Sequence, residues 1–304
     1  MSIRPTLEPV CTSPVSTAAI DVVIEARARD LGGVAINRVL PSPRRRTVGP
    51  FTFLDHMGEM DFGPGQGIDV PPHPHIGLAT VTYLFEGEIE HRDSLGSVQS
   101  IRPGDVNWMT AGRGIAHSER TPQSLRLAES RLHGLQLWVA LPVAHEEIEP
   151  AFYHHPGARI PEVELAGVSL RVLAGRAYGV TSPTETLSPM FYVDATIAAG
   201  CELELTDEHE ERSVYVVQGE VDCGLERAAA GRMVVFTRGA RVVLRAEQQS
   251  RLVLLGGAPL AGPRYMEWNF VSSSKDRLAK AKADWKARRF PPVVGDDGYV
   301  PFPE

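Results

Sequence analysis

Short β-prone stretches separated by turn residues make up most of this chain. One of them, Thr-Val-Thr-Tyr-Leu-Phe at 80–85, is rich in β-branched and aromatic residues and is followed by a Glu-Gly-Glu turn at 86–88. A Pro-Gly turn at 103–104 then precedes the apolar stretch 106–109. Short strands with turns roughly every 8 to 12 residues are typical of an all-β sandwich or barrel. We therefore expect an all-β fold.

Two further β-prone segments, 20–26 and 34–40, flank a Gly-rich turn at 31–33 near the N-terminus. Because strands joined by a short Gly-containing turn usually pair with each other, we expect a hairpin here. The first 20 or so residues mix Pro, Ser and Thr without periodicity and predict a loose lead-in.

A helical period appears only near the C-terminus. In the segment 275–288, Leu278, Ala281 and Trp285 recur on one helical face, and the serines at 272–274 are good N-terminal caps. Two prolines at 291–292 end the pattern. The sequence thus predicts one short amphipathic helix followed by an extended tail.

The chain also repeats part of its own pattern. Tyr-Leu-Phe-Glu-Gly-Glu at 83–88 is answered by Tyr-Val-Val-Gln-Gly-Glu at 215–220, and Thr-Ala-Gly at 110–112 by Thr-Arg-Gly at 237–239. Such an echo favours two copies of one structural unit. We expect these copies to occupy residues 1–145 and 146–304, with the helix and tail belonging to the second.

Length and composition agree with an ordinary two-domain protein. The chain has 304 residues, 43% of them hydrophobic, and a net charge of -7, which argues against direct nucleic-acid binding. No window approaches the ~18 apolar residues of a membrane span, and no secretory pattern opens the sequence. Three cysteines without a Cys-x-x-Cys spacing predict free thiols. We therefore expect a cytoplasmic protein without a membrane partner.

Two pairs of metal-binding residue types frame the β-prone segment after residue 72. His73 and His75 form the first pair, and His117 and Glu119 form the second. Successive side chains of a strand point to opposite faces, so the members of each pair share a face and can reach one ion. Three imidazoles and a carboxylate suit iron, manganese, nickel, copper or zinc better than calcium or magnesium.

The second copy does not repeat this ligand set. Carrying the two offsets of the echo forward places Leu205 and Asp207 opposite the first pair, and Leu244 and Ala246 opposite the second. Two other histidines, His56 and His91, have two interpretations. Each either orients a metal ligand or is a hydrogen-bonded structural residue.

The chain resembles the pirin family of bicupins over most of its length. The resemblance rests on a set of short motifs: Pro72-His73-Pro74-His75, Glu86-Gly87-Glu88, Asp93-Ser94-Leu95-Gly96, Arg102-Pro103-Gly104-Asp105, Trp108-Met109-Thr110-Ala111-Gly112-Arg113-Gly114-Ile115 and His117-Ser118-Glu119. A characteristic ending at 290–304 adds to it. As a set, these motifs are specific.

This resemblance implies two cupin barrels of antiparallel strands, with a metal, usually iron, in the N-terminal barrel only. It assigns the four ligands to His73, His75, His117 and Glu119. The chain departs from the family at 76–80, where Ile-Gly-Leu-Ala-Thr stands in place of the Arg-Gly-Phe-Glu-Thr of many pirins. This departure leaves the ligands intact but changes residues that shape the pocket.

The resemblance further implies a dioxygenase like the pirins with quercetin 2,3-dioxygenase activity, which opens the ring of flavonol-like phenols. Iron(II) is the leading cofactor, and manganese, nickel, copper and zinc are alternatives. A small phenol and dioxygen would be the partners, and Glu119 would be both a ligand and the catalytic base. The alternative is a non-catalytic protein whose metal or redox state regulates a protein partner, as the similarity to eukaryotic pirins implies.

Overall fold

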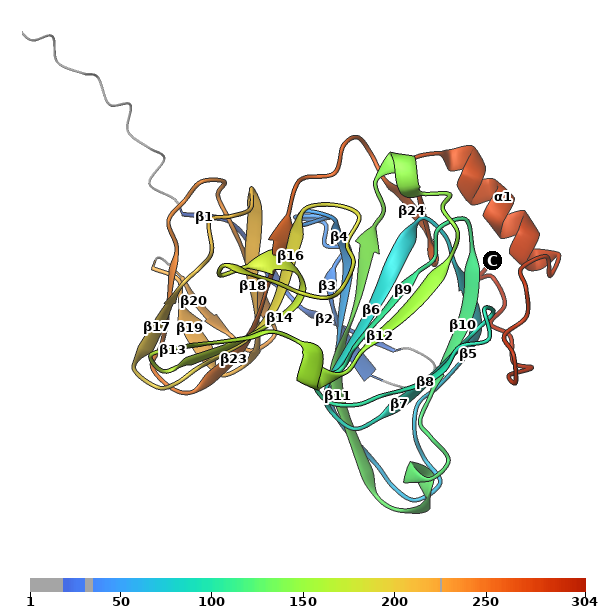
Figure 1. Cartoon of the computed structure of the whole chain (residues 1–304), viewed down its shortest axis with the longest axis horizontal. Coiled ribbons are helices and arrows are strands. Elements are labelled where there is room, and N and C mark those ends of the chain that lie inside the picture. The colour runs from blue at the N-terminus through green and yellow to red at the C-terminus, as the bar shows by residue number, and fades with distance from the viewer. Residues whose placement is uncertain (1–18, 31–34, 225) are drawn as a thin grey trace, which may run out of the picture.

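A computed structural model describes residues 19–30, 35–224 and 226–304 and shows two β-barrels side by side (Figure 1). Each barrel combines a large sheet with a smaller four-stranded sheet. All strand pairings between named strands are antiparallel in this part of the chain, which confirms the expected all-β bicupin class. No helix among these residues is long and apolar enough to cross a membrane.

The first barrel, at the right of Figure 1, contains the segment with the two ligand pairs. Its large sheet runs in the order β12 (Ala151–His155), β9 (Val106–Thr110), β6 (Leu78–Glu86), β11 (Ser130–Ala140), β4 (Phe51–Phe62), β3 (Ala35–Leu40), β2 (Arg27–Asp30). Its small sheet runs in the order β5 (Asp69–His75), β10 (Ile115–Arg120), β7 (Ile89–Asp93), β8 (Val98–Ile101). Short 3-10 helices lie at Leu125–Leu127, Val143–His145 and Gly157–Arg159.

The second barrel repeats this arrangement. Its large sheet runs in the order β1 (Ile20–Glu25), β21 (Arg232–Phe236), β18 (Glu211–Gln218), β23 (Ser250–Gly257), β16 (Met190–Ile197), β14 (Val168–Ala177), β13 (Glu162–Leu165), with β15 (Val180–Thr181) beside β14. Its small sheet runs in the order β17 (Cys201–Glu204), β22 (Val243–Ala246), β19 (Glu220–Asp222), β20 (Arg227–Ala229). The internal echo therefore marks a real repeat of strand order.

Three segments pack on the barrel that is formed mainly by the other half of the chain, across the boundary expected at residue 145. Strand β1 pairs with β21 of the second barrel, and β12 pairs with β9 of the first. The segment 20–26 therefore does not form the predicted hairpin with 34–40, and β2 is the partner of β3 instead. The predicted turn at 31–33 lies outside the described residues. Backbone donors at a sheet edge need a partner, and each barrel takes one edge strand from the other half of the chain.

The C-terminal segment is the third that crosses, because it packs on the first barrel. It comprises β24 (Tyr265–Glu267), β25 (Phe270–Ser272), α1 (Lys275–Lys286) and the tail. Helix α1 begins after Ser274, whose side chain accepts the backbone N–H of Arg277, and it buries the predicted Leu278, Ala281 and Trp285. These side chains join Ile76 and Ala116 of the first barrel in one apolar cluster. The tail thus supports the outer side of the strands that carry the ligand pairs.

The two large sheets face each other across a shared apolar core. Tyr83 and Leu137 of the first barrel belong to the same buried cluster as Tyr215 and Leu255 of the second. Period-two alternation in β6 directs Tyr83 into this core and the neighbouring Thr82 toward the interior of its own barrel, where it bonds to Glu119. The interior of the first barrel is therefore separated from the interface between the barrels.

Candidate metal centre

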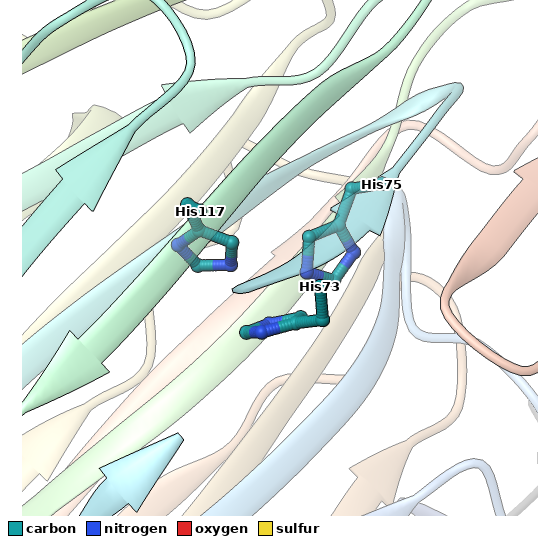
Figure 2. A group of neighbouring side chains, drawn as sticks. All are labelled: His73, His75 and His117. Carbon is teal, nitrogen blue, oxygen red and sulfur yellow. The ribbon is translucent and has the colours of Figure 1, made fainter. Parts of the chain in front are cut away.

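Three histidines of β5 and β10 converge inside the first barrel (Figure 2). The two strands are antiparallel neighbours, with His117 directly opposite His73 and Ile115 opposite His75. All three imidazoles are buried, and one ligand atom from each lies within 4.8 Å of the others. The period-two argument thus brings together three of the four expected ligands.

Hydrogen bonds define the protonation pattern of two of these rings. His73 Nδ1 lies 2.9 Å from the carbonyl oxygen of Pro71, and His75 Nδ1 lies 3.1 Å from that of Asn269. A carbonyl oxygen only accepts, so both Nδ1 atoms carry the proton and each Nε2 keeps its lone pair. The Nε2 atom of His117 is buried and has no hydrogen-bond partner. A buried nitrogen with a free lone pair and no hydrogen-bond partner fits a metal ligand.

Burial keeps these imidazoles neutral. Desolvation lowers the pKa of His73 to about 4, and it also lowers those of His75 and His117 well below the usual value. The neighbouring imidazoles lower the pKa of His75 and His117 further. Neutral imidazole is the form that binds metals, so no proton has to be displaced from these rings near neutral pH.

The fourth expected residue, Glu119, is buried on the same strand but is not part of the group formed by the three histidines. A bulge between His117 and Glu119 shifts the pairing with β5, and Thr82 Oγ1 donates to Glu119 Oε1 over 3.1 Å. Burial raises the pKa of this carboxyl, although His91 and Thr82 oppose the effect. A metal cation beside it would favour the ionised form.

These observations fit a first-row transition metal. The available donors are imidazole nitrogens with free lone pairs and one buried carboxylate, a set poorly suited to calcium or magnesium. Within the described ranges, His73, His75 and His117 form the group of three or more potential ligands close enough to share an ion.

The two additional histidines have different roles. His56 bonds through Nδ1 to Tyr215 of the second barrel at 2.7 Å and through Nε2 to His133 at 2.8 Å, so it belongs to the barrel interface. His91 lies behind the triad, with its Nδ1 atom 3.3 Å from His117 Nδ1. Sequence reasoning could not choose between the two roles, because it depends on which long-range neighbour each ring meets.

Aromatic side chains contact the histidines of the centre, and sequence reasoning missed them. The ring of Trp138 contacts His75 edge-on at 5.2 Å between centroids and stacks on Phe53 at 4.0 Å. Phe152 stacks on His91 at 4.3 Å. Flat apolar walls beside polar donors are typical of sites that bind small aromatic molecules.

Family comparisons agree with this architecture. The family model described as Pirin matches residues 33–139, and the one described as Pirin C-terminal cupin domain matches residues 192–291. The first covers the strands with the histidine triad, and the second covers most of the second barrel.

Individual relatives match over most of their length. A Pirin-like protein of Caulobacter vibrioides is 50% identical over 289 residues, which is 94% of this chain and 100% of the relative. A Pseudomonas aeruginosa protein, named as a candidate quercetin 2,3-dioxygenase, is 42% identical over 86% of this chain and 82% of its own. The crystal structure of quercetin 2,3-dioxygenase from Acinetobacter baumannii, at 35% identity, superposes with a TM-score of 0.86 over 93% of this chain and 95% of that one.

Proposed function

The chain belongs to the pirin family, and on that premise we propose that it is a metal-dependent dioxygenase that opens the ring of flavonol-like phenols. The observation that carries the proposal is the convergence of three buried, neutral imidazoles. The similarity to the quercetin 2,3-dioxygenase of Acinetobacter baumannii supports the substrate class. A small phenol and dioxygen would then be the partners.

We assign the metal to His73, His75, His117 and Glu119, with iron(II) as the leading ion and manganese, nickel, copper and zinc as alternatives. A bound ion would supply Lewis acidity that lowers the pKa of a phenolic or enolic hydroxyl. His73 and His75 would be held in orientation by the carbonyl oxygens of Pro71 and Asn269.

Glu119 would have a second role as the base that accepts the hydroxyl proton at a carboxylate oxygen. The hydroxyl of Thr82 would hold that carboxylate in place through its hydrogen bond. Trp138 would pack against the flat rings of the phenol, and Phe53 would hold Trp138 in place by stacking on it. The overall reaction would consume one dioxygen, open the flavonol ring and release carbon monoxide.

The direct test is to load the protein anaerobically with iron(II), admit oxygen, and follow flavonol loss and carbon monoxide release. We expect turnover in the loaded protein. Glu119→Gln should reduce turnover strongly at matched iron content, because the amide cannot accept the proton. His133→Gln, at a half-buried histidine outside the triad, is the control. Absence of turnover at full iron occupancy would contradict the proposal.

The second candidate, a metal- or redox-responsive protein that regulates a partner, is favoured by one contact. Asn269 lies between β24 and β25, and its carbonyl oxygen bonds to His75, so a change at the metal reaches the surface formed by the C-terminal segment. Partner capture that depends on metal and persists when a phenol blocks the pocket would favour this role. The cytoplasmic location also stays a prediction.

A further inference from the structure

A buried hydrogen-bonded chain leads from a carboxylate to the third histidine of the triad. Asp93 Oδ2 lies 3.1 Å from His91 Nε2, and His91 Nδ1 lies 3.3 Å from His117 Nδ1. The three residues are 0%, 3% and 1% exposed, so water does not compete for these bonds. His117 thus differs from His73 and His75, whose Nδ1 atoms bond to backbone carbonyls.

Surrounding contacts fix each member of the chain. Asp93 Oδ1 accepts the backbone N–H groups of Leu95 and Ser97 at 2.9 and 3.0 Å, which leaves Oδ2 for His91. The ring of His91 stacks on Phe152 with an interplanar angle of 11°. Strand pairing sets the spacing, because β7 runs antiparallel to β10 with Asp93 opposite His117.

The order of donors and acceptors follows from the carboxylate. An ionised carboxylate only accepts, so the proton between Asp93 and His91 belongs to His91 Nε2. In a neutral imidazole the other nitrogen is then an acceptor, so His91 Nδ1 receives the proton of His117 Nδ1. His117 Nε2 is left with a lone pair and no proton. This is the buried nitrogen that lacks a partner.

We infer that Asp93 and His91 are positioning residues that hold His117 in the tautomer that presents the Nε2 lone pair to a metal ion. The inference rests on the metal site proposed above. Neither side chain touches the ion. Their effect would appear in metal affinity, where outer partners of ligating histidines typically contribute roughly 10- to 100-fold.

Asp93→Asn is the sharpest variant, because it is nearly isosteric with Asp93. Asn Oδ1 can keep both backbone hydrogen bonds, while the amide NH2 takes the position of Oδ2 and can only donate. The donor order then reverses, so that His91 Nε2 accepts and the proton of His117 moves to Nε2. We expect cobalt(II) to bind roughly 10- to 100-fold more weakly, measured by chelator competition, with an altered visible absorption spectrum.

A double variant separates the effect of Asp93 on His117 through His91 from its effect on the turn at Leu95 and Ser97. His91→Phe preserves a flat ring against Phe152 but removes both nitrogens. If the relay operates, adding Asp93→Asn to His91→Phe causes no further loss of cobalt affinity. Two results would overturn the inference without contradicting the proposed metal site. One is an equal loss of cobalt affinity when Asp93→Asn is made in the natural chain and in His91→Phe. The other is cobalt binding by Asp93→Asn as tight as that of the natural chain. Failure of the natural chain to bind cobalt overturns both the inference and the proposed metal site.

The natural chain offers a readout that needs no variant. Long-range 1H–15N correlation spectra of protein labelled at histidine distinguish the two neutral tautomers. In the metal-free protein near neutral pH, we expect the proton of His117 on Nδ1 and that of His91 on Nε2. The opposite tautomer at either ring overturns the inference, even where a variant does not fold.

Discussion

The two barrels of this chain have the same strand order but different interiors. In each, a small sheet in the order first, fourth, second, third strand closes a large sheet in the described part of the chain. The core of the second barrel is built mainly from aliphatic residues, Phe191 and Phe236. The buried Arg212 is an exception, and its guanidinium donates to the carbonyl oxygens of Thr206 and Ala240. The interior of the first holds the histidine triad, Glu119 and the positioning pair. One backbone plan therefore accommodates either a candidate metal centre or a largely apolar core.

Strand register shows which residues correspond. Leu203 faces Leu244 between β17 and β22, as His73 faces His117 between β5 and β10. Extending the register identifies six positions that are polar in the first barrel and buried and apolar in the second. Leu203, Leu205, Leu244, Ala246, Val221 and Cys223 stand where the first barrel has His73, His75, His117, Glu119, His91 and Asp93.

This correspondence has a physical reason. A buried polar group costs free energy unless it is paired, so a barrel without an ion does better with apolar side chains at every one of these positions. The proposed ligands are replaced together with His91 and Asp93, the two residues inferred to position His117. That is expected if His91 and Asp93 position His117, because a leucine in place of His117 would offer His91 no hydrogen-bond partner.

The variant with the largest expected effect is His117→Leu. It gives the first barrel the side chain that the second barrel has at the corresponding position, Leu244. We expect metal affinity to fall by roughly 100-fold or more, because a ligand is lost and its strand neighbour cannot replace it. The metal-free protein should remain folded but lose about 1–3 kcal/mol of stability, because His91 Nδ1 loses its buried donor. Metal content and thermal unfolding measure the two effects, with His145→Gln, in the 3-10 helix Val143–His145, as the control. Unchanged metal content would contradict the proposed site.

The reverse change, Leu244→His, should cost stability and bring no metal. The imidazole would lie in an apolar core where the thiol of Cys223 is only a weak hydrogen-bonding partner, which costs about 3 kcal/mol in the free energy of unfolding. Urea denaturation measures the loss. Leu244→Met keeps the volume and polarity and should cost under about 1.5 kcal/mol. A stable Leu244→His variant would mean that the second barrel is not packed as tightly as its core indicates.

Local features of the sequence predicted local features of the structure. The period-two spacing of His73 and His75 brought the two rings to one face, and the caps and apolar face of α1 were read correctly from residues 274–285. Both depend on neighbours a few positions away. The same holds for Asp93, two residues from His91 on β7, which the strand period could have identified as its partner.

Long-range pairing could not be derived in the same way. Nothing within the segment 20–25 reveals that its partner is β21, more than 200 residues away. The offset of the repeat also failed by two residues, so Leu203 and Leu205, not Leu205 and Asp207, correspond to His73 and His75. The cause is the segment from Leu205 to Tyr215, which is two residues longer than the corresponding segment from His75 to Tyr83.

The interface between the barrels should contribute to acid sensitivity, in addition to the contribution of the buried triad. Burial lowers the pKa of His56 to about 4 in the folded state, against about 6.5 when exposed. Between these values the unfolded chain binds a proton that the folded chain does not, so stability present above pH 6.5 is lost as the pH falls toward 4. The shift corresponds to roughly 3 kcal/mol.

His56→Gln should remove this part of the pH dependence, because the amide does not titrate. Urea unfolding at pH 7 and pH 4 measures the difference between the two proteins. His145→Gln, in the 3-10 turn Val143–His145, is the matched control. If the free energy of unfolding changes equally with pH in the natural chain and in His56→Gln, then His56 does not contribute to the pH dependence of stability.

The smallest expected effect concerns the C-terminal tail, which packs on the first barrel. Trp285 Nε1 donates to the carbonyl oxygen of Val300 over 2.9 Å, and the N–H of Val300 donates to Pro72, next to His73. Trp285→Phe removes the first bond and part of a buried ring, and should lower the free energy of unfolding by about 2 kcal/mol. Because Pro72 directly precedes His73, a proposed ligand, cobalt affinity should fall slightly too.

The control is Lys280→Ala, on the exposed face of the same helix. It should change stability by under about 0.5 kcal/mol and leave cobalt affinity unchanged. If both variants behave alike, the tail covers the metal strands without stabilising them.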